Sequence, residues 1–236
     1  MQKNKIVFLI RAYNEATRIL GVIEGIVVAG YTQILVVDDG STDGTQGLLQ
    51  YLIKGNRVHF VHHITNRGAW AALETGLEYI RQNGTKNSWE YFVTFDADGQ
   101  HDVWDMDKFI QAFDADESLD VVLGSRFIVK TNTNVPFLRR CILAGGRIFT
   151  SLVSGIHLTD AHNGYRMMRV AVLQKIKITM DGMEYASVLI DQIASYHLHF
   201  QEVPVNIHYD EYTLRKWQRY GGPLRIVIRM LFKKFF

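Results

Sequence analysis

The chain has 236 residues, of which 47% are hydrophobic and 21% charged, with a formal net charge of +2. This composition is typical of a globular protein with a hydrophobic core, and it excludes a disordered chain. The near-neutral charge does not indicate nucleic-acid binding. The single cysteine, Cys141, excludes an internal disulfide and a cysteine-rich metal site and fits a cytoplasmic protein. We expect neither a signal peptide nor a transmembrane helix, because the apolar runs are too short or carry charges.

The first half of the chain alternates predicted strands with predicted helices. Short apolar runs are typical of buried strands, and they lie at residues 5–10, 33–37, 58–61, 91–93 and 120–124. Amphipathic helices are predicted between them, at residues 19–27, 48–52, 70–80 and 103–113. This alternation predicts an α/β fold with a mostly parallel, doubly wound sheet.

Polar residues follow the first two predicted strands. Asn14 and Glu15 suit the start of the first helix. Asp38 and Asp39 end the second strand and precede a segment with two glycines, at residues 40–45. Ligands of open α/β sheets bind outside the carboxyl ends of strands, so these carboxylates could accept hydrogen bonds from a base N–H or a ribose hydroxyl. The alternative is that they are only turn and cap residues.

Two candidate sites surround the third predicted strand. His59, His62 and His63 raise the question of a zinc site, but no cysteine or spaced histidine pair completes a ligand set. Arg67 and Gly68 then precede a predicted helix. A helix N-terminus favours anions, so this turn either contacts phosphate or is purely structural.

The strongest candidate site follows the fourth predicted strand, in the segment from Thr94 to His101. Because successive side chains of a strand point to opposite faces, Asp96 and Asp98 are expected on one face. Two such close carboxylates repel each other unless a cation lies between them or one takes up a proton. Mg²⁺ typically takes one or two carboxylates and completes its shell with water and substrate phosphates, and Gln100 could add a neutral oxygen. The alternative is a solvated, aspartate-rich turn.

The alternation ends after Ser125 and Arg126. We expect a helix at residues 137–154 that carries Arg139 and Arg140, another helix at 183–197, and an edge strand at 200–208, because the last contains a proline. Between them, Asp160 is a candidate general base and Arg166 a candidate phosphate contact; a buried Asp–Arg pair that only holds the fold is the alternative.

The last residues, 214–236, form a basic and aromatic tail. The pattern suits a helix on an anionic membrane surface, and it is too short and too charged to span a bilayer. A homodimer contact or a helix that packs on the core is the alternative.

Taken together, these motifs resemble those of the family 2 glycosyltransferases, and most closely the dolichol- or polyprenyl-phosphate mannosyltransferase-like group. The resemblance covers nearly the whole chain in the family's order. The segments that carry it are Ala12-Tyr13-Asn14-Glu15, residues 36–45, Asn66-Arg67-Gly68, residues 96–101, Gly124-Ser125-Arg126 and Glu202-Val203-Pro204-Val205. The segments 159–166 and 212–218 are similar to those of bacterial members associated with surface polysaccharide synthesis.

The resemblance implies a GT-A fold, an inverting reaction, a nucleotide-sugar donor and a divalent metal, Mg²⁺ or Mn²⁺. It implies a single domain over residues 1–213, with a Rossmann-like nucleotide-sugar half at 1–126 and an acceptor half at 127–213. The nucleotide site would contain Ala12, Tyr13, Glu15, Asp38, Asp39, Arg67, Asp96, Ala97 and Asp98. The metal would be held by Asp96, Asp98 and Gln100. Phosphate or acceptor contacts would come from Arg126, Arg139, Arg140 and Arg166.

Two positions depart from the family's pattern. Arg11 stands where many members have proline. In similar bacterial sequences a glutamate often follows an Ala-Ser pair, whereas Val188 follows Ala186-Ser187 here. The second departure slightly favours a relative that binds nucleotide sugar or a partner without turnover.

Two enzymatic functions fit the resemblance. The first expectation is transfer of a hexose from a UDP- or GDP-sugar to a lipid-linked saccharide of surface polysaccharide, at the inner face of the cell membrane. The second is transfer to a polyprenyl phosphate. A sugar hydroxyl needs a base, for which Asp160 is the candidate, with Glu184 behind it. A lipid phosphate is already anionic and needs positioning cations such as Arg126. A nucleotidyltransferase of similar sheet topology is a weaker alternative, because its signature loop is missing.

Overall fold

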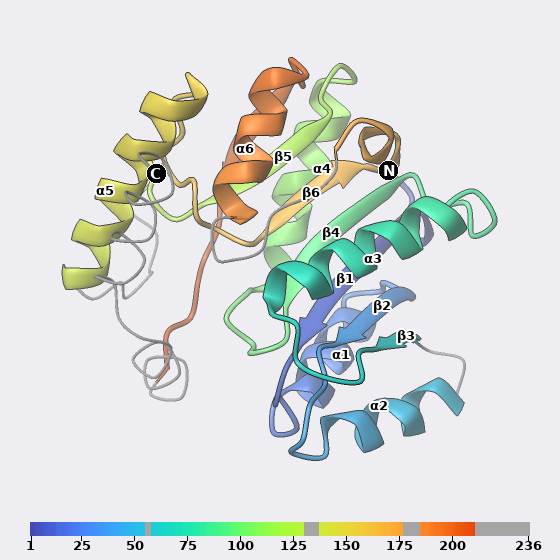
Figure 1. The fold of residues 1–236 in the computed structure, drawn as a ribbon. Coiled ribbons are helices and arrows are strands. Elements are labelled where there is room, and N and C mark those ends of the chain that lie inside the picture. Colours follow the sequence, from blue (N-terminus) through green and yellow to red (C-terminus); the bar gives the residue numbers. More distant parts are fainter. Residues whose placement is uncertain (55–57, 130–136, 177–184, 211–236) are drawn as a thin grey trace.

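The computed structural model describes residues 1–54, 58–129, 137–176 and 185–210 (Figure 1). Its centre is one sheet with the strand order β3-β2-β1-β4-β6-β5-β7. The strands are β1 (Ile6–Ala12), β2 (Gln33–Asp38), β3 (His59–His62), β4 (Tyr91–Asp96), β5 (Val121–Ser125), β6 (Arg166–Arg169) and β7 (Phe200–Pro204). Strand β6 runs antiparallel to β4 and β5, and the other pairs are parallel. The predicted α/β fold with a mostly parallel sheet is confirmed, and so is the edge position of the strand that contains Pro204.

Helices cover both faces of this sheet. They are α1 (Ile19–Val28), α2 (Thr45–Lys54), α3 (Ala69–Asn83), α4 (Met106–Ala115), α5 (Phe137–Ser154) and α6 (Tyr185–Ser195). Three short 3₁₀ turns accompany them, η1 (Lys3–Lys5), η2 (Val103–Asp105) and η3 (Val170–Gln174). Figure 1 shows α3 and α6 in front of the sheet and α1 and α4 behind it. Two hydrophobic cores follow from this arrangement, one on each face.

Strand β1 lies inside the sheet, and its residues Ile6–Ile10 are continuously apolar because both of its faces are covered. Phe8 and Ile10 belong to the core beneath α1 and α4, whereas Val7 and Leu9 belong to the core beneath α3 and α6. All four side chains are fully buried. A strand covered on both faces needs apolar residues at every position, because neither side meets water.

The last described segment, residues 205–210, connects distant parts of the sheet, and we call it the terminal segment. The Val205 N–H donates to the Ser125 carbonyl at 2.9 Å, and the His208 N–H donates to the Gln100 carbonyl at 2.9 Å. Ile207 forms an isolated antiparallel bridge with His101. The terminal segment therefore ties the loop after β4 to the end of β5. Within the described ranges, no helix has both the length and the hydropathy needed to cross a bilayer.

Candidate active site

The candidate site lies where the carboxyl ends of β1, β2 and β4 meet. Strand register places Ala12 beside Asp38 and Arg11 beside Asp96. The predicted acidic residues of two separate motifs therefore lie at the same end of the sheet, where the strands end. Open α/β sheets bind their ligands at this end.

The loops after β1 and β2 hold each other through side chains of their turn residues. The Thr42 N–H donates to Asn14 Oδ1 at 2.9 Å, and the Asn14 N–H donates to Ser41 Oγ at 2.9 Å. The Glu15 N–H donates to Thr45 Oγ1, also at 2.9 Å. Glu15 itself is buried, so of the predicted residues in this turn Tyr13 offers more exposed surface. These contacts order the two loops without any ligand.

Asp38 is fully buried at the end of β2. Its carboxylate accepts hydrogen bonds from the Ser41 hydroxyl and from His62 Nδ1, the latter at 2.9 Å. Its carboxylate thus holds the turn after β2 against β3. A direct contact of Asp38 with the nucleotide stays a prediction.

Asp39 organises the loop that leads to α3. One carboxylate oxygen accepts from His63 Nδ1 at 2.7 Å and from the Arg67 N–H at 2.9 Å, and the other accepts from the Gly68 N–H at 2.8 Å. The buried Asp39 therefore fixes the turn before α3, while the Arg67 side chain stays exposed. Among the predicted nucleotide-site residues, Arg67 is a cation that a ligand can reach.

The histidine signal near β3 has a structural explanation. His62 and His63 each hold one of the two adjacent aspartates, and His63 Nε2 also lies 2.9 Å from Thr75 Oγ1. In the part of the chain that the structure describes, no group of three or more His, Cys, Asp or Glu side chains could hold a metal ion. The roles of His62 and His63 could not be read from their spacing.

The loop after β4 carries the predicted metal ligands. Strand β4 ends at Asp96, and Asp98 lies in the following turn, where its Oδ1 accepts the Gln100 N–H at 3.1 Å. The sequence predicted that strand alternation would place the two carboxylates on one face. That reasoning is wrong, because the strand ends at Asp96 and Asp98 lies in the turn after it. Asp96, Asp98 and Gln100 are each partly exposed at this edge, whereas the intervening Ala97 is buried.

His101 contacts both the backbone and the side chain of Asp96. The Asp96 N–H donates to His101 Nδ1 at 3.2 Å, and His101 Nε2 lies 3.5 Å from Asp96 Oδ2. The imidazole stacks on Tyr165, with ring centroids 4.8 Å apart. Burial lowers the pKa of His101 to about 4 against the opposing effect of Asp96, so the ring is neutral at pH 7.

The exposed donor atoms of this loop fit Mg²⁺ or Mn²⁺. All three candidate ligands offer oxygen, which both ions accept. Two carboxylates and one amide fill only part of an octahedral shell, so the remaining positions suit water or diphosphate oxygens. The missing third acidic or histidine ligand is thus compatible with a metal that binds together with a phosphate-bearing substrate.

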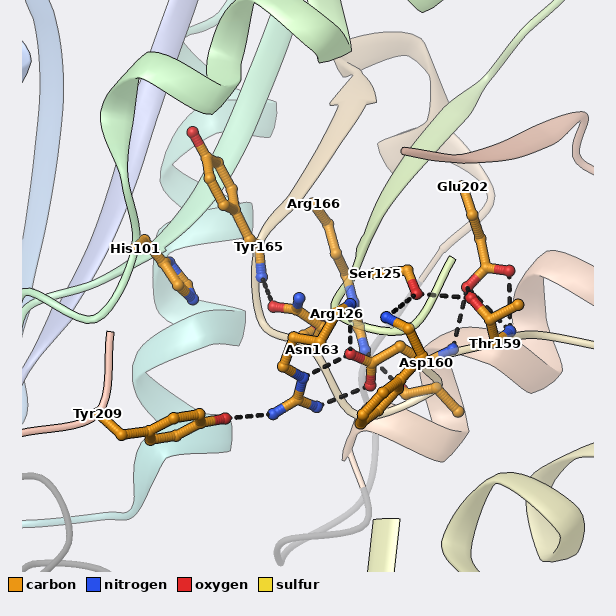
Figure 2. Close-up of polar contacts among 12 residues, drawn as sticks. His101, Ser125, Arg126, Thr159, Asp160, Asn163, Tyr165, Arg166, Glu202 and Tyr209 are labelled. Carbon is orange, nitrogen blue, oxygen red and sulfur yellow. Dashed lines mark hydrogen bonds and ion pairs between the residues drawn. The ribbon is translucent and has the colours of Figure 1, made fainter. Parts of the chain in front are cut away.

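Arg126 and Asp160 form a buried ion pair at the end of β5 (Figure 2). Arg126 Nε and Nη2 donate to the two carboxylate oxygens at 2.5 and 2.7 Å, and Nη1 donates to Tyr209 Oη at 2.7 Å. The side chains are only 5% and 1% exposed. Burial alone would lower the pKa of Arg126, but the Asp160 carboxylate outweighs it and raises the pKa. The sequence offered a buried Asp–Arg pair within residues 159–166 as one alternative, and the structure shows that Asp160 pairs with Arg126 from the end of β5.

Glu202 and Arg166 hold the loop that carries Asp160. Glu202 accepts the backbone N–H groups of Thr159 and Asp160, each at 3.0 Å or less (Figure 2). Arg166 is buried and donates to the carbonyls of Asn163 and Ala161 at 2.9 and 3.2 Å. Its guanidinium thus supports the loop from inside. A phosphate contact by Arg166 stays a prediction.

Several predicted residues cannot be placed. Arg139 and Arg140 belong to α5, but their side chains lie outside the described residues. Glu184 and the predicted tail at 214–236 also lie outside them.

An open, mostly parallel α/β sheet with polar side chains at the carboxyl ends of its strands places the chain among the α/β proteins that bind their ligands at that end of the sheet. Comparison with known sequences identifies the family: the chain belongs to Glycosyl transferase family 2, whose sequence profile matches residues 8–177. The resemblance inferred from the motifs is thereby confirmed.

The chain is similar to two characterised relatives and to one solved structure. The chain is 29% identical to the UDP-N-acetylglucosamine–dolichyl-phosphate N-acetylglucosaminyltransferase of Methanococcus voltae, with 98% of this chain and 97% of the relative covered. It is 33% identical to the polyprenol monophosphomannose synthase of Mycolicibacterium smegmatis, over 62% of this chain and 54% of the relative. Glucosyl-3-phosphoglycerate synthase from Mycobacterium tuberculosis, solved with Mn²⁺, UDP and phosphoglyceric acid, has a TM-score of 0.67 at 17% identity, covering 97% and 77% of the two chains. This last likeness supports the GT-A fold.

Proposed function

We propose that this glycosyltransferase transfers a sugar from a UDP- or GDP-sugar to a polyprenyl or dolichyl phosphate, with inversion at the anomeric carbon. Support comes first from the relative that matches over nearly its whole length, which is named for a dolichyl-phosphate acceptor. The proposal therefore prefers the second of the two enzymatic functions expected from the sequence. The lipid-linked saccharide acceptor is the competing function.

One observation carries the choice of acceptor: the candidate base is committed to another partner. Both carboxylate oxygens of Asp160 accept hydrogen bonds from Arg126 inside the protein. A carboxylate whose two oxygens are both held by a guanidinium inside the protein is not free to take a proton from a substrate. A sugar hydroxyl needs a base to remove its proton, whereas a lipid phosphate is already anionic. The engaged Asp160 thus favours a phosphate acceptor.

The donor half of the proposal rests on the loop after β4. Glycosyl transfer develops positive charge on the sugar ring and negative charge on the departing diphosphate, as in glycoside hydrolysis. A divalent ion bound there acts as a Lewis acid toward the diphosphate. Asp96, Asp98 and Gln100 would hold that ion, and the exposed Arg67 would attract the diphosphate from the β2 side. Arg126 is held too deeply to reach a ligand in the described conformation, and its proposed role is to fix the Asp160 loop.

The test is a transfer assay with radiolabelled donors. Purified protein is incubated with UDP- or GDP-sugars, Mg²⁺ or Mn²⁺, and either a polyprenyl phosphate or a polyprenyl-diphosphate-linked saccharide. We expect labelled lipid from the polyprenyl phosphate, loss of product with EDTA, and a loss of about 100-fold or more in Asp98→Asn, the size typical for removing a key electrostatic group. Asp114→Asn is the matched control, because Asp114 is an exposed acid that pairs with the N-terminus.

Three results would contradict the proposal. Labelled product only from the lipid-linked saccharide would show that the acceptor is a saccharide and not the lipid phosphate. Full activity in the presence of EDTA would show that the reaction does not need a divalent metal. Tight binding of nucleotide sugar without product from any acceptor would point to the non-catalytic relative. Membrane attachment through residues 214–236, on the inner face of the membrane, and a homodimer stay predictions from the sequence; vesicle flotation of the full chain tests the first.

A further inference from the structure

Arg11 places a permanent positive charge directly beside the first acidic residue of the candidate metal site. The two are register partners on β1 and β4, so their side chains leave the same face of the sheet. Arg11 Nη2 donates to Asp96 Oδ1 at 2.5 Å. The Arg11 side chain is 9% exposed, whereas that of Asp96 is 31% exposed. A guanidinium does not lose its proton in proteins, so this positive charge is present at every working pH.

The loop after Asp160 closes over this pair. At Gly164, a Cβ atom would lie 3.2 Å from Asp96 Oδ2 and 3.6 Å from Arg11 Nη2. The Gly164 carbonyl also accepts the Thr94 hydroxyl. The backbone of this loop therefore packs on the ion pair from one side, while His101 Nε2 lies near Asp96 Oδ2 at 3.5 Å. Asp96 is held in one orientation before any metal arrives.

We propose that Arg11 is a positioning residue that offsets one of the two negative charges of the metal site, so that a divalent cation binds strongly only together with the nucleoside diphosphate. This inference rests on the proposed function. Asp96 and Asp98 alone carry two negative charges, and Arg11 reduces their sum to one. The diphosphate restores the missing negative charge and adds oxygen ligands. Metal and nucleotide consequently strengthen each other's binding, as linkage requires.

If the Arg11–Asp96 pair only held the fold, removing Arg11 would have a different effect on metal affinity. Removing such a pair would change the stability of the protein and leave the affinity for metal alone unchanged or weaker, because Asp96 would become less ordered. Removing a charge that opposes the metal must strengthen binding of the metal alone. The sign of the change in metal affinity therefore separates the two roles.

The experiment is a Mn²⁺ titration of the full chain, followed by the electron paramagnetic resonance signal of free Mn²⁺, with and without UDP or GDP. Arg11→Met removes the charge at similar length, and Arg11→Gln removes it while keeping a donor for Asp96. Without nucleotide, we expect both variants to bind Mn²⁺ at least about ten-fold more tightly than the unaltered protein, because the repulsion between the guanidinium and the divalent ion is removed.

Two controls frame this result. Arg11→Lys keeps the charge and should leave Mn²⁺ affinity near that of the unaltered protein. Lys5→Met removes an equal charge from an ion pair with Glu90 just before the same strand. It lies about 20 Å from Arg11 by the rise of a strand, so screening should make it silent.

Unchanged or weaker Mn²⁺ binding in folded Arg11→Met and Arg11→Gln would overturn the inference. If the unaltered protein with nucleotide binds Mn²⁺ but the variants behave like it, only the role of Arg11 fails. If no form binds Mn²⁺ under any condition, the role of Arg11 and the metal-dependent function fail together. Circular dichroism of each variant shows whether it is folded, and Arg11→Gln preserves the test if Arg11→Met does not fold.

Discussion

Removing one partner of the buried Arg126–Asp160 pair should strongly lower the free energy of unfolding, because it leaves the other charge buried without a partner. Asp160→Ala leaves a guanidinium that is 5% exposed with Tyr209 in place of a counter-charge. An uncompensated buried charge typically costs about 3–5 kcal/mol. For a chain of this size that corresponds to roughly 10 °C in Tm. Urea unfolding followed by circular dichroism measures the free energy directly.

A matched comparison separates the stability cost of leaving a charge buried from the cost of losing an ion pair. Glu90→Ala breaks the exposed Lys5–Glu90 pair, where both partners are at least 36% exposed, and should cost less than about 1 kcal/mol. Replacing both buried partners, in Arg126→Met with Asp160→Leu, should recover much of the loss, because no charge is then left buried. A cost of Asp160→Ala as small as that of Glu90→Ala would refute the reasoning. An Asp160→Asn protein of unchanged stability but at least 100-fold lower activity would instead identify Asp160 as a chemical group.

Three further predictions concern the loops of the site. Gly40→Ala should cost at least about 2 kcal/mol in urea unfolding, because the φ angle is +72° and the new Cβ would lie 2.5 Å from the Thr65 carbonyl carbon. Asp39→Asn should raise the hydrogen-exchange rates of the two backbone amides that Asp39 holds, since an amide cannot replace both carboxylate oxygens as acceptors. His101, with a folded pKa of about 4 against 6.5 when unfolded, binds fewer protons in the native state. Its contribution is therefore present above pH 6.5 and falls by about 2–3 kcal/mol as the pH drops toward 4, and His101→Asn should flatten that part of the stability curve.

The fold could be predicted from the sequence because its signals are local. Each apolar run between turn residues became a strand of the sheet, and the helix predicted at residues 137–154 has those bounds as α5. Strand β6 was missed. It spans four residues with an arginine at each end, so neither a continuous apolar run nor an alternation reveals it. Its pairing with β4 and β5 is a tertiary event that local periodicity does not encode.

The candidate site was predictable in its positions and not in its partners. Acidic residues at strand ends were recognisable because turns and carboxylates follow apolar runs. Their partners come from elsewhere in the chain: His62 reaches Asp38 from β3, and Tyr209 reaches Arg126 across 83 positions. Such pairs depend on the crossing of strands and loops, which spacing alone cannot show. Glu202 is an exception in part, because it stood in one of the motifs that carried the family resemblance.

The terminal segment explains how the two predicted halves of the chain can act as one site. Its backbone holds the loop of the candidate metal ligands through Gln100, and its next side chain, Tyr209, holds Arg126. Asn206 adds a hydrogen bond from its N–H to Asp105, at the start of α4. A shift of this segment must therefore disturb the loop of the candidate metal ligands and the Asp160 loop together.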